Sequence, residues 1–261
     1  MHRIKNKNVL LTGATGGIGR QIALTLGRAG ASLMLAARSA DQLESLQAEL
    51  RSTGARADFA AGDLLDDSYR RNLPLRARSA MGQIDILINN AGFGGHGKFH
   101  QRELARDQAM MQVNMVSLVS LTHLYLQGMV ERRSGRLLHV ASTAAFLPGP
   151  LQAVYYATKS FVLSFSQAIA KELDGTGVTS TALCPGAVAT GFVAAGDLDG
   201  VKVFDKAASA ESVAECGYEA MLRGELVKIN EKGLHFLLNW VVPFLPRKVV
   251  LQISQKTMEK I

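Results

Sequence analysis

The chain has few cysteines and no uninterrupted apolar run long enough to cross a membrane. Its 261 residues include two cysteines, Cys184 and Cys216, which are too few for a disulfide framework. The basic start, MHRIKNKNVLLTGATGG, is interrupted by Thr and Gly after a few apolar residues, which argues against a secretory signal. No window reaches the roughly 18 uninterrupted apolar residues of a spanning helix. We therefore expect a reduced, cytoplasmic setting.

Acidic residues are outnumbered by basic ones, and the formal net charge is +7. Such a charge suits an anionic partner, for example a phosphorylated cofactor, an acyl carrier, a membrane surface or nucleic acid. The basic residues are scattered, however, and form no runs interleaved with aromatic residues. Because nucleic-acid binding needs a basic stripe, we expect no nucleic-acid partner.

Short apolar runs of β type alternate with longer amphipathic stretches along most of the chain. Several of the runs are apolar at consecutive positions, which is typical of strands covered on both faces. This alternation predicts an α/β fold, a doubly wound parallel sheet of about seven strands with helices on both faces, in a single domain covering residues 1–261. The predicted strands are 8–13, 32–38, 55–61, 84–92, 135–142, 177–186 and 225–230, and the predicted helices are 17–29, 40–53, 66–81, 102–132, 153–174 and 211–223.

The C-terminal segment, residues 231–261, differs from the rest of the chain. It is rich in large apolar residues, is broken by Pro243 and Pro246, and ends in basic residues. One interpretation is that it packs over the sheet edge or the substrate cleft. The alternative is an interfacial helix on a membrane surface, which would make the protein membrane-peripheral.

A glycine-rich turn follows the first predicted strand and precedes the first predicted helix. Gly13, Gly17 and Gly19 would let the backbone turn sharply and approach a pyrophosphate, which the helix N-terminus would attract. A plain tight turn is the alternative, but the strand before and the helix after favour a nucleotide site.

The end of the second predicted strand distinguishes between the two nicotinamide dinucleotides. An acidic residue there would bind the ribose 2′-hydroxyl of NAD(H), but the sequence reads LAARS, with Arg38 and Ser39. Arg38 can pair with a 2′-phosphate and Ser39 can add a hydrogen bond. We therefore expect NADP(H) rather than NAD(H), the alternative being a solvated arginine that opens the next loop.

The stretch AVYYATKSF places two tyrosines ahead of one lysine on a predicted helix. Tyr155 lies four residues before Lys159 and Tyr156 lies three before it, so either pair could share a helix face. A phenol held by an ammonium group is a candidate proton donor. Local spacing leaves the choice between the two tyrosines open.

Taken together, the motifs resemble those of the short-chain dehydrogenase/reductase family, whose fold is of Rossmann type. The family motif TGxxxGxG is similar to residues 12–19, its NNAG to 89–92 and its PGxVxT to 185–190. The resemblance covers residues 8 to 190 strongly. The family serine stands thirteen residues before its tyrosine and the tyrosine four before the lysine, so the resemblance selects Tyr155 over Tyr156.

The resemblance implies a catalytic set of Asn114, Ser142, Tyr155 and Lys159. Reduction of a carbonyl delivers hydride to carbon, so negative charge develops on oxygen and a proton must arrive there. Tyr155 would supply that proton, Lys159 would favour phenolate and bind the nicotinamide ribose, and Ser142 would stabilise the developing charge. Asn114 resembles the residue that holds a water against the lysine.

The resemblance also implies the remaining cofactor contacts. Asp63 would accept a hydrogen bond from the adenine amine, and the proline-glycine motif after the sixth strand would hold the carboxamide. The full expected set is Gly13, Thr15, Gly16, Gly17, Ile18, Gly19, Arg38, Ser39, Asp63, Leu64, Asn90, Ala91, Gly92, Asn114, Tyr155, Lys159, Pro185, Gly186, Val188 and Thr190. No metal site is expected.

The substrate side of the cleft is expected to be apolar. We expect it to be formed by 93–98, 143–152, a substrate loop at 190–206 and the C-terminal segment, with Phe93, Phe146, Leu147, Val154, Phe192 and Val193 suggesting an apolar cavity. The sequence thus predicts an NADP(H)-dependent oxidoreductase that interconverts a ketone and a secondary alcohol on a carbonyl, oxoacyl or steroid-like substrate. The resemblance implies a homodimer or homotetramer. The alternative is a catalytically idle NADP(H)-binding regulator or membrane-peripheral scaffold.

Overall fold

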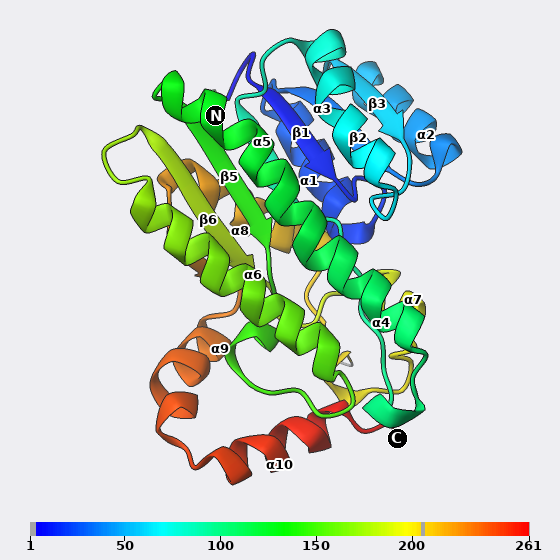
Figure 1. Ribbon diagram of the computed structural model, residues 1–261, viewed down its shortest axis with the longest axis vertical. Helices are drawn as coiled ribbons and strands as arrows, with labels where there is room; N and C mark the ends of the chain where they lie inside the picture. The colour runs from blue at the N-terminus through cyan, green and yellow to red at the C-terminus, as the bar shows by residue number, and fades with distance from the viewer. Residues whose placement is uncertain (1–3, 205–206, 261) are drawn as a thin grey trace.

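The strands form a parallel sheet whose order reverses direction near its middle. The computed structural model describes residues 4–204 and 207–260, so residues 205 and 206 of the predicted substrate loop and residue 261 of the C-terminal segment lie outside the described residues. Within them, seven strands are ordered β3-β2-β1-β4-β5-β6-β7, and all pairings are parallel. This confirms the predicted doubly wound sheet (Figure 1). The strands are β1 (Asn8–Thr12), β2 (Ser32–Ala37), β3 (Ala57–Ala61), β4 (Ile86–Asn89), β5 (Gly135–Val140), β6 (Val178–Cys184) and β7 (Val227–Ile229).

Helices cover both faces of the sheet, which explains why its strands are apolar at consecutive positions. Val9 and Leu11 of β1 pack with α1, α2 and α8 on one face, while Leu10 packs with α3, α5 and α6 on the other. All three side chains are fully buried. The helices are α1 (Gly17–Arg28), α2 (Ala40–Ser52), α3 (Asp67–Met81), α5 (Leu118–Glu131), α6 (Ala153–Glu172) and α8 (Ala210–Arg223).

The predicted helix 102–132 is divided by a π-helical stretch. A 3₁₀ turn, η1 (Phe99–Gln101), precedes α4 (Leu104–Met111), and the π-helical residues η2 (Gln112–Ser117) join α4 to α5. π-Helical turns recur at functional sites because they change the direction of side chains, and this one carries the buried Asn114.

One helical stretch in the described part of the chain is long and apolar enough to cross a membrane by length and composition. It runs from Leu104 to Glu131 and has a mean hydropathy of 1.2. The core helix of a soluble protein meets the same criterion. Here Leu121 and Met129 of α5 are buried in the cluster that packs on the sheet.

The C-terminal segment folds into a bent arm, which we call the C-terminal arm (residues 231–260). It contains α9 (Lys232–Phe236), a π-helical turn η5 (Leu237–Val241), a 3₁₀ turn η6 (Val242–Phe244) and α10 (Arg247–Met258). Figure 1 shows α9 and α10 at the end of the molecule away from β3 and α2. Leu238 packs in a buried cluster with Leu163 of α6, and Met258 packs in another with Tyr156, so the arm packs on the fold as the first interpretation of the segment expected.

Short elements close the same end of the molecule. The 3₁₀ turn η3 (Thr143–Phe146) follows β5, while α7 (Phe192–Ala195) and η4 (Lys202–Phe204) lie in the predicted substrate loop. The glycine-rich loop after β4 is held by a buried ion pair, in which Nη2 of Arg102 lies 2.6 Å from Oδ1 of Asp107. Arg102 also donates to the backbone oxygen of His96 at 2.7 Å. This pair therefore anchors the loop to α4.

We predict that Asp107→Ala lowers the free energy of unfolding by about 3–5 kcal/mol, because it leaves the Arg102 guanidinium buried without its counter-ion. The carboxylate is 2% exposed and the guanidinium side chain 14% exposed. Glu219→Ala, which removes an exposed pair with Arg223, is the matched control and should cost less than about 1 kcal/mol. Urea denaturation measures both, and equal small losses would contradict the prediction.

Candidate active site

The site lies where the strand order reverses. β1 and β4 are neighbours in the sheet, but the connection after β1 leads to β2 on one side and the connection after β4 leads to β5 on the other. In open α/β sheets ligands bind beyond the carboxyl ends of strands at such a point. A cavity of about 890 Å³ opens there and is lined by residues that follow β1, β2, β3, β4, β5 and β6.

The glycine turn after β1 forms one end of the cavity. Gly13 has a positive φ of 64°, which an L side chain rarely adopts. A Cβ on Gly19 would overlap the Gly13 carbonyl oxygen, and a Cβ on Gly17 would overlap the Thr190 side chain. α1 begins after Gly16 without a side-chain cap or an acidic residue in its first turn. Its free N–H groups can therefore hold an anion such as a pyrophosphate.

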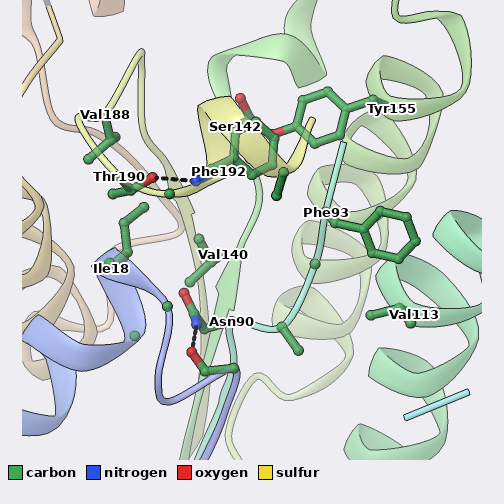
Figure 2. A pocket seen from close by; sticks show the side chains of 18 of the residues that line it. Ile18, Asn90, Phe93, Val113, Val140, Ser142, Tyr155, Val188, Thr190 and Phe192 are labelled. Atoms are coloured by element: carbon green, nitrogen blue, oxygen red, sulfur yellow. Dashed lines mark hydrogen bonds between the residues drawn. The ribbon is translucent and has the colours of Figure 1, made fainter. Parts of the chain in front are cut away.

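Side chains at the end of β4 hold this turn in place. Asn90 donates from Nδ2 to the backbone oxygens of Thr12 at 3.1 Å and Gly13 at 3.0 Å, as Figure 2 shows for the bond beside the turn. Thr12 Oγ1 accepts from the backbone N–H groups of Asn90 and Ala91, each at 3.1 Å. Thr12 was absent from the expected site residues, although its place directly before Gly13 is the signal that could have identified it.

The loops after β2 and β3 line the same end of the cavity. Arg38 is exposed, faces the cavity and has no ion pair among the described residues. Ser39 Oγ accepts from the backbone N–H of Gln42 at 3.3 Å and so caps α2. Asp63 and Leu64 also line the cavity. A guanidinium therefore stands where β2 ends, and no carboxylate directly follows that strand.

Tyr155 and Ser142 face each other across the middle of the cavity. Figure 2 shows the Tyr155 hydroxyl pointing toward Ser142, and the Ser142 side chain is close enough to affect the pKa of Tyr155. Ser142 Oγ accepts from the backbone N–H of Ala144 at 3.1 Å and lies 3.4 Å from the carbonyl oxygen of Pro185. Burial raises the pKa of Tyr155 well above its usual value, and the nearby Ser142 lowers it in part.

Tyr156 points to a different part of the structure. Its ring is buried and stands edge-on to the Tyr155 ring with centroids 6.2 Å apart. Its hydroxyl lies near Ser254 of α10 rather than Ser142, and burial raises its pKa to about 12. The structure therefore brings Tyr155, and not Tyr156, to the serine.

Lys159 lies one helical turn after Tyr155 and is buried. Its Nζ donates to the backbone oxygen of Val140 at 2.8 Å and stands 5.7 Å from the centre of the Tyr155 ring. Burial lowers the pKa of Lys159 to about 8, because the ammonium is removed from water. The ammonium group thus lies beneath the phenol at the end of β5.

Asn114 stands behind the cavity wall, unlike the other expected site residues. Its Oδ1 accepts from the backbone N–H of Phe93 at 3.1 Å, and its Nδ2 donates to the Phe93 oxygen at 3.0 Å and to Thr158 Oγ1 at 3.1 Å. Its amide group is therefore engaged by the loop after β4 and by α6. The expected cavity residues apart from Asn114 all line the wall.

The loop after β6 closes the cavity opposite the glycine turn. Pro185, Gly186, Val188 and Thr190 line it. The N–H of Gly186 donates to Oδ1 of Asn230 at 3.0 Å. Asn230 follows β7 and was not among the expected residues, because its role arises only when β6 and β7 pair.

The far end of the cavity is apolar. The rings of Phe192 and Tyr155 lie 5.4 Å apart, and Phe93 stands nearby (Figure 2). Four of the expected pocket residues, Phe146, Leu147, Val154 and Val193, pack behind the wall instead. The cavity is lined instead by Gln152, Val203, Phe204 and Met258. The segments that contain these residues were named from the sequence, but the residues themselves were not. The cavity therefore joins an anion-binding end to an apolar end, with a phenol and a hydroxyl between them.

Comparison with known proteins places the chain in one family. A family model described as short chain dehydrogenase matches residues 7–198. A curated relative, the ketoacyl reductase HetN of Nostoc sp., is 35% identical over 72% of this chain, and the match spans 66% of that relative, just under two thirds of its length. The 1-deoxy-11-beta-hydroxypentalenate dehydrogenase of Streptomyces exfoliatus is 33% identical over 85% of this chain and 81% of its own.

A solved structure supports the fold. A short-chain dehydrogenase from Sphingobium yanoikuyae in complex with NADPH superposes with a TM-score of 0.82 at 29% identity, over 88% of this chain and 90% of that one. The matched residues of the family model contain the glycine turn, Ser142, Tyr155 and Lys159.

We predict that the buried Lys159 makes stability depend on pH. Its pKa falls from 10.5 to about 8 on folding, so between these values the unfolded chain binds more protons and stability rises with pH. Relative to Lys159→Met, the wild type should gain about 2 kcal/mol in free energy of unfolding from neutral pH to about pH 10. Urea denaturation of both proteins measures this, and a pH-independent difference would contradict it.

Proposed function

This chain belongs to the short-chain dehydrogenase family, and we propose that it is an NADP(H)-dependent oxidoreductase that interconverts a ketone and a secondary alcohol on an apolar substrate. One observation carries the proposal. The Tyr155 hydroxyl points toward Ser142 inside a cavity that also contains the glycine turn, and the Lys159 ammonium lies 5.7 Å from the centre of the phenol ring. These groups are those that proton transfer to a carbonyl oxygen requires.

In the proposed reaction the bound dinucleotide supplies or accepts a hydride, and the chain's own residues handle the oxygen. Ser142 donates a hydrogen bond to the substrate oxygen and stabilises its developing negative charge. Tyr155 then delivers a proton from its hydroxyl to that oxygen in the reductive direction. Its raised pKa keeps the phenol protonated at neutral pH, so it is ready to act as the acid.

Lys159 tunes this proton transfer in the proposal. Its ammonium lies 5.7 Å from the Tyr155 ring centre, and a nearby positive charge favours the phenolate that remains once the proton has left. Its pKa of about 8 means that the charge is present at neutral pH and is lost as pH rises above that value. We also assign it the contact with the nicotinamide ribose that the family resemblance implies.

We assign Asn114 a positioning role. The three hydrogen bonds of its amide join the loop after β4 to Thr158 on α6. These bonds fix the helix that carries Tyr155 and Lys159. Both N–H groups of the Asn114 amide already donate hydrogen bonds, to Phe93 and to Thr158. The water that the resemblance implies beside Lys159 would therefore be held by another group.

The preference for NADP(H) rests on Arg38. Its guanidinium lines the cavity at the end of β2 without an ion-pair partner among the described residues, and it can bind a 2′-phosphate bidentately. The Sphingobium yanoikuyae relative binds NADPH, which supports the same choice here. The other expected cavity residues would hold the adenine, the pyrophosphate and the carboxamide.

The substrate is proposed to be an apolar carbonyl or alcohol, because Phe93, Phe192, Val203 and Met258 line the far end of the cavity. A ketoacyl or a hydroxypentalenate-like substrate fits the names of the two relatives. We propose one domain over residues 1–261, with 190–206 as the substrate loop, and a cytoplasmic homodimer or homotetramer.

We predict that Tyr155→Phe lowers the rate of NADPH-dependent ketone reduction by about 100-fold or more, the usual contribution of a positioned acid. Tyr156→Phe should retain most of the activity, because the Tyr156 hydroxyl lies near Ser254 rather than Ser142. NADPH consumption with a panel of apolar ketones measures both variants. If Tyr156→Phe were inactive and Tyr155→Phe active, the assignment would be wrong.

The same assay separates the enzyme from a catalytically idle cofactor-binding protein. Tyr155→Phe should still bind NADPH, measured by quenching of protein fluorescence, while it loses turnover. A wild type that binds NADPH tightly and turns over no ketone in the panel would favour the idle regulator or scaffold.

We predict that Arg38→Asp raises the KM for NADPH by about 10-fold to 100-fold, because it removes a charge-assisted contact worth about 1.5–3 kcal/mol. The KM for NADH should rise little or fall. Arg76→Asp makes the same charge change on an exposed residue of α3 and serves as the control. Equal effects of Arg38→Asp on both cofactors would refute the proposed preference.

A further inference from the structure

Four large apolar side chains are exposed on α9, η5 and η6 of the C-terminal arm, and we call them the arm patch. Phe236 is 62% exposed, Leu237 42%, Trp240 64% and Phe244 80%. They lie on consecutive turns of α9, η5 and η6. Exposed aromatic residues grouped in this way mark an interaction surface more often than scattered single residues do.

The arm patch does not result from poor packing of the arm. Leu234, Leu238 and Val242 recur at every fourth position and pack against the body of the protein. Phe236 and Trp240 are displaced by two positions from this series, so they project from the opposite side of the helix. The arm therefore has its own core-facing side and presents the patch away from it.

Cations flank the arm patch in the sequence. Lys232 precedes it, Arg247 and Lys248 follow it, and Lys256 lies further along α10. All four are exposed and have no ion pair among the residues that the structure describes. The acidic residues of the arm, Glu231 and Glu259, stand at its two ends. The surface is thus both apolar and positive.

We propose that the C-terminal arm docks on an anionic lipid bilayer. Aromatic residues flanked by Lys and Arg are the composition of segments that lie in the membrane interface, where the rings enter the headgroup region and the cations meet anionic lipids. The net charge of the chain, +7, acts in the same direction. This proposal stands apart from the proposed catalytic function.

A second copy of the chain fits this surface less well. In a two-fold symmetric contact the same patch meets itself, so the basic residues of one arm would approach those of the other, and the arm offers only Glu231 and Glu259 as acidic partners. Like charges brought together in this way oppose association. Charge complementarity therefore selects a lipid surface.

The arm also reaches the apolar end of the cavity. Ser254 of α10 lies near the Tyr156 hydroxyl, and Met258 lines the cavity. The His96 ring nitrogen lies 2.8 Å from the Met258 oxygen. A bilayer bound to the outer side of the arm would thus lie beside the segment that closes the substrate end, where an apolar molecule dissolved in lipid could enter.

Tryptophan fluorescence provides a direct test, because Trp240 is the single tryptophan of the chain. We expect vesicles of phosphatidylcholine and phosphatidylglycerol to shift its emission to shorter wavelength and to carry the full-length protein upward in a flotation gradient. Vesicles of phosphatidylcholine alone should do so much less. Added salt should weaken the binding to the anionic vesicles.

Two variants and their controls locate the binding surface. Arg247→Glu/Lys248→Glu and, separately, Phe236→Ser/Phe244→Ser should each weaken partitioning by more than about tenfold. Arg76→Glu/Arg78→Glu on α3 makes the same charge change, and Leu75→Ser removes an apolar side chain that is 66% exposed. Both controls should bind vesicles nearly as the wild type does.

Several outcomes would overturn the proposal. Absence of flotation and of an emission shift with anionic vesicles would do so. Equal losses in the α3 controls would indicate attraction by net charge alone. An emission shift that depends on protein concentration without lipid, together with an oligomer mass in sedimentation that Phe236→Ser/Phe244→Ser lowers, would identify a second copy as the occupant. NADPH consumption by the same preparations reports on catalysis separately.

Discussion

The hydrogen bond from the Lys159 ammonium to the Val140 carbonyl, 2.8 Å long, joins the helix α6 to the end of strand β5. Tyr155 precedes Lys159 by one turn and Ser142 follows Val140 by two residues, so this single contact sets the phenol against the serine hydroxyl. It has an energetic cost, since a buried ammonium is desolvated and its pKa falls to about 8.

The sheet explains how residues far apart in the chain reach this point. Parallel strands all end at one edge of the sheet, so the loops after β1, β4, β5 and β6 meet there. Asn90 bonds the glycine turn, and Ser142 lies beside the Pro185 carbonyl. Each loop is thus fixed by its neighbour, which keeps the cavity in shape before any ligand is bound.

Much of this arrangement could be predicted from the sequence, and the exceptions have physical causes. Consecutive apolar residues in the strands identified the covered sheet, and the glycine spacing located the turn. Local spacing could not separate Tyr155 from Tyr156, because both pairs with Lys159 share a helix face; the resemblance selected Tyr155. Asn114 lies in a π-helical turn, and its amide accepts a hydrogen bond from the backbone N–H of Phe93. Periodicity does not reveal such a turn.

The two ends of the cavity differ in how they relate to the family. The matched segment ends at residue 198 and contains the glycine turn, the serine, the tyrosine and the lysine. Val203, Phe204 and Met258 line the apolar end and lie beyond that segment. Arm contacts, such as that between His96 and the Met258 oxygen, tie these later residues to the family core. Cofactor chemistry is therefore built from the shared part of the chain. The shape of the apolar end depends on the part that carries the C-terminal arm, so the proposed membrane surface and the lining residue Met258 belong to the same arm.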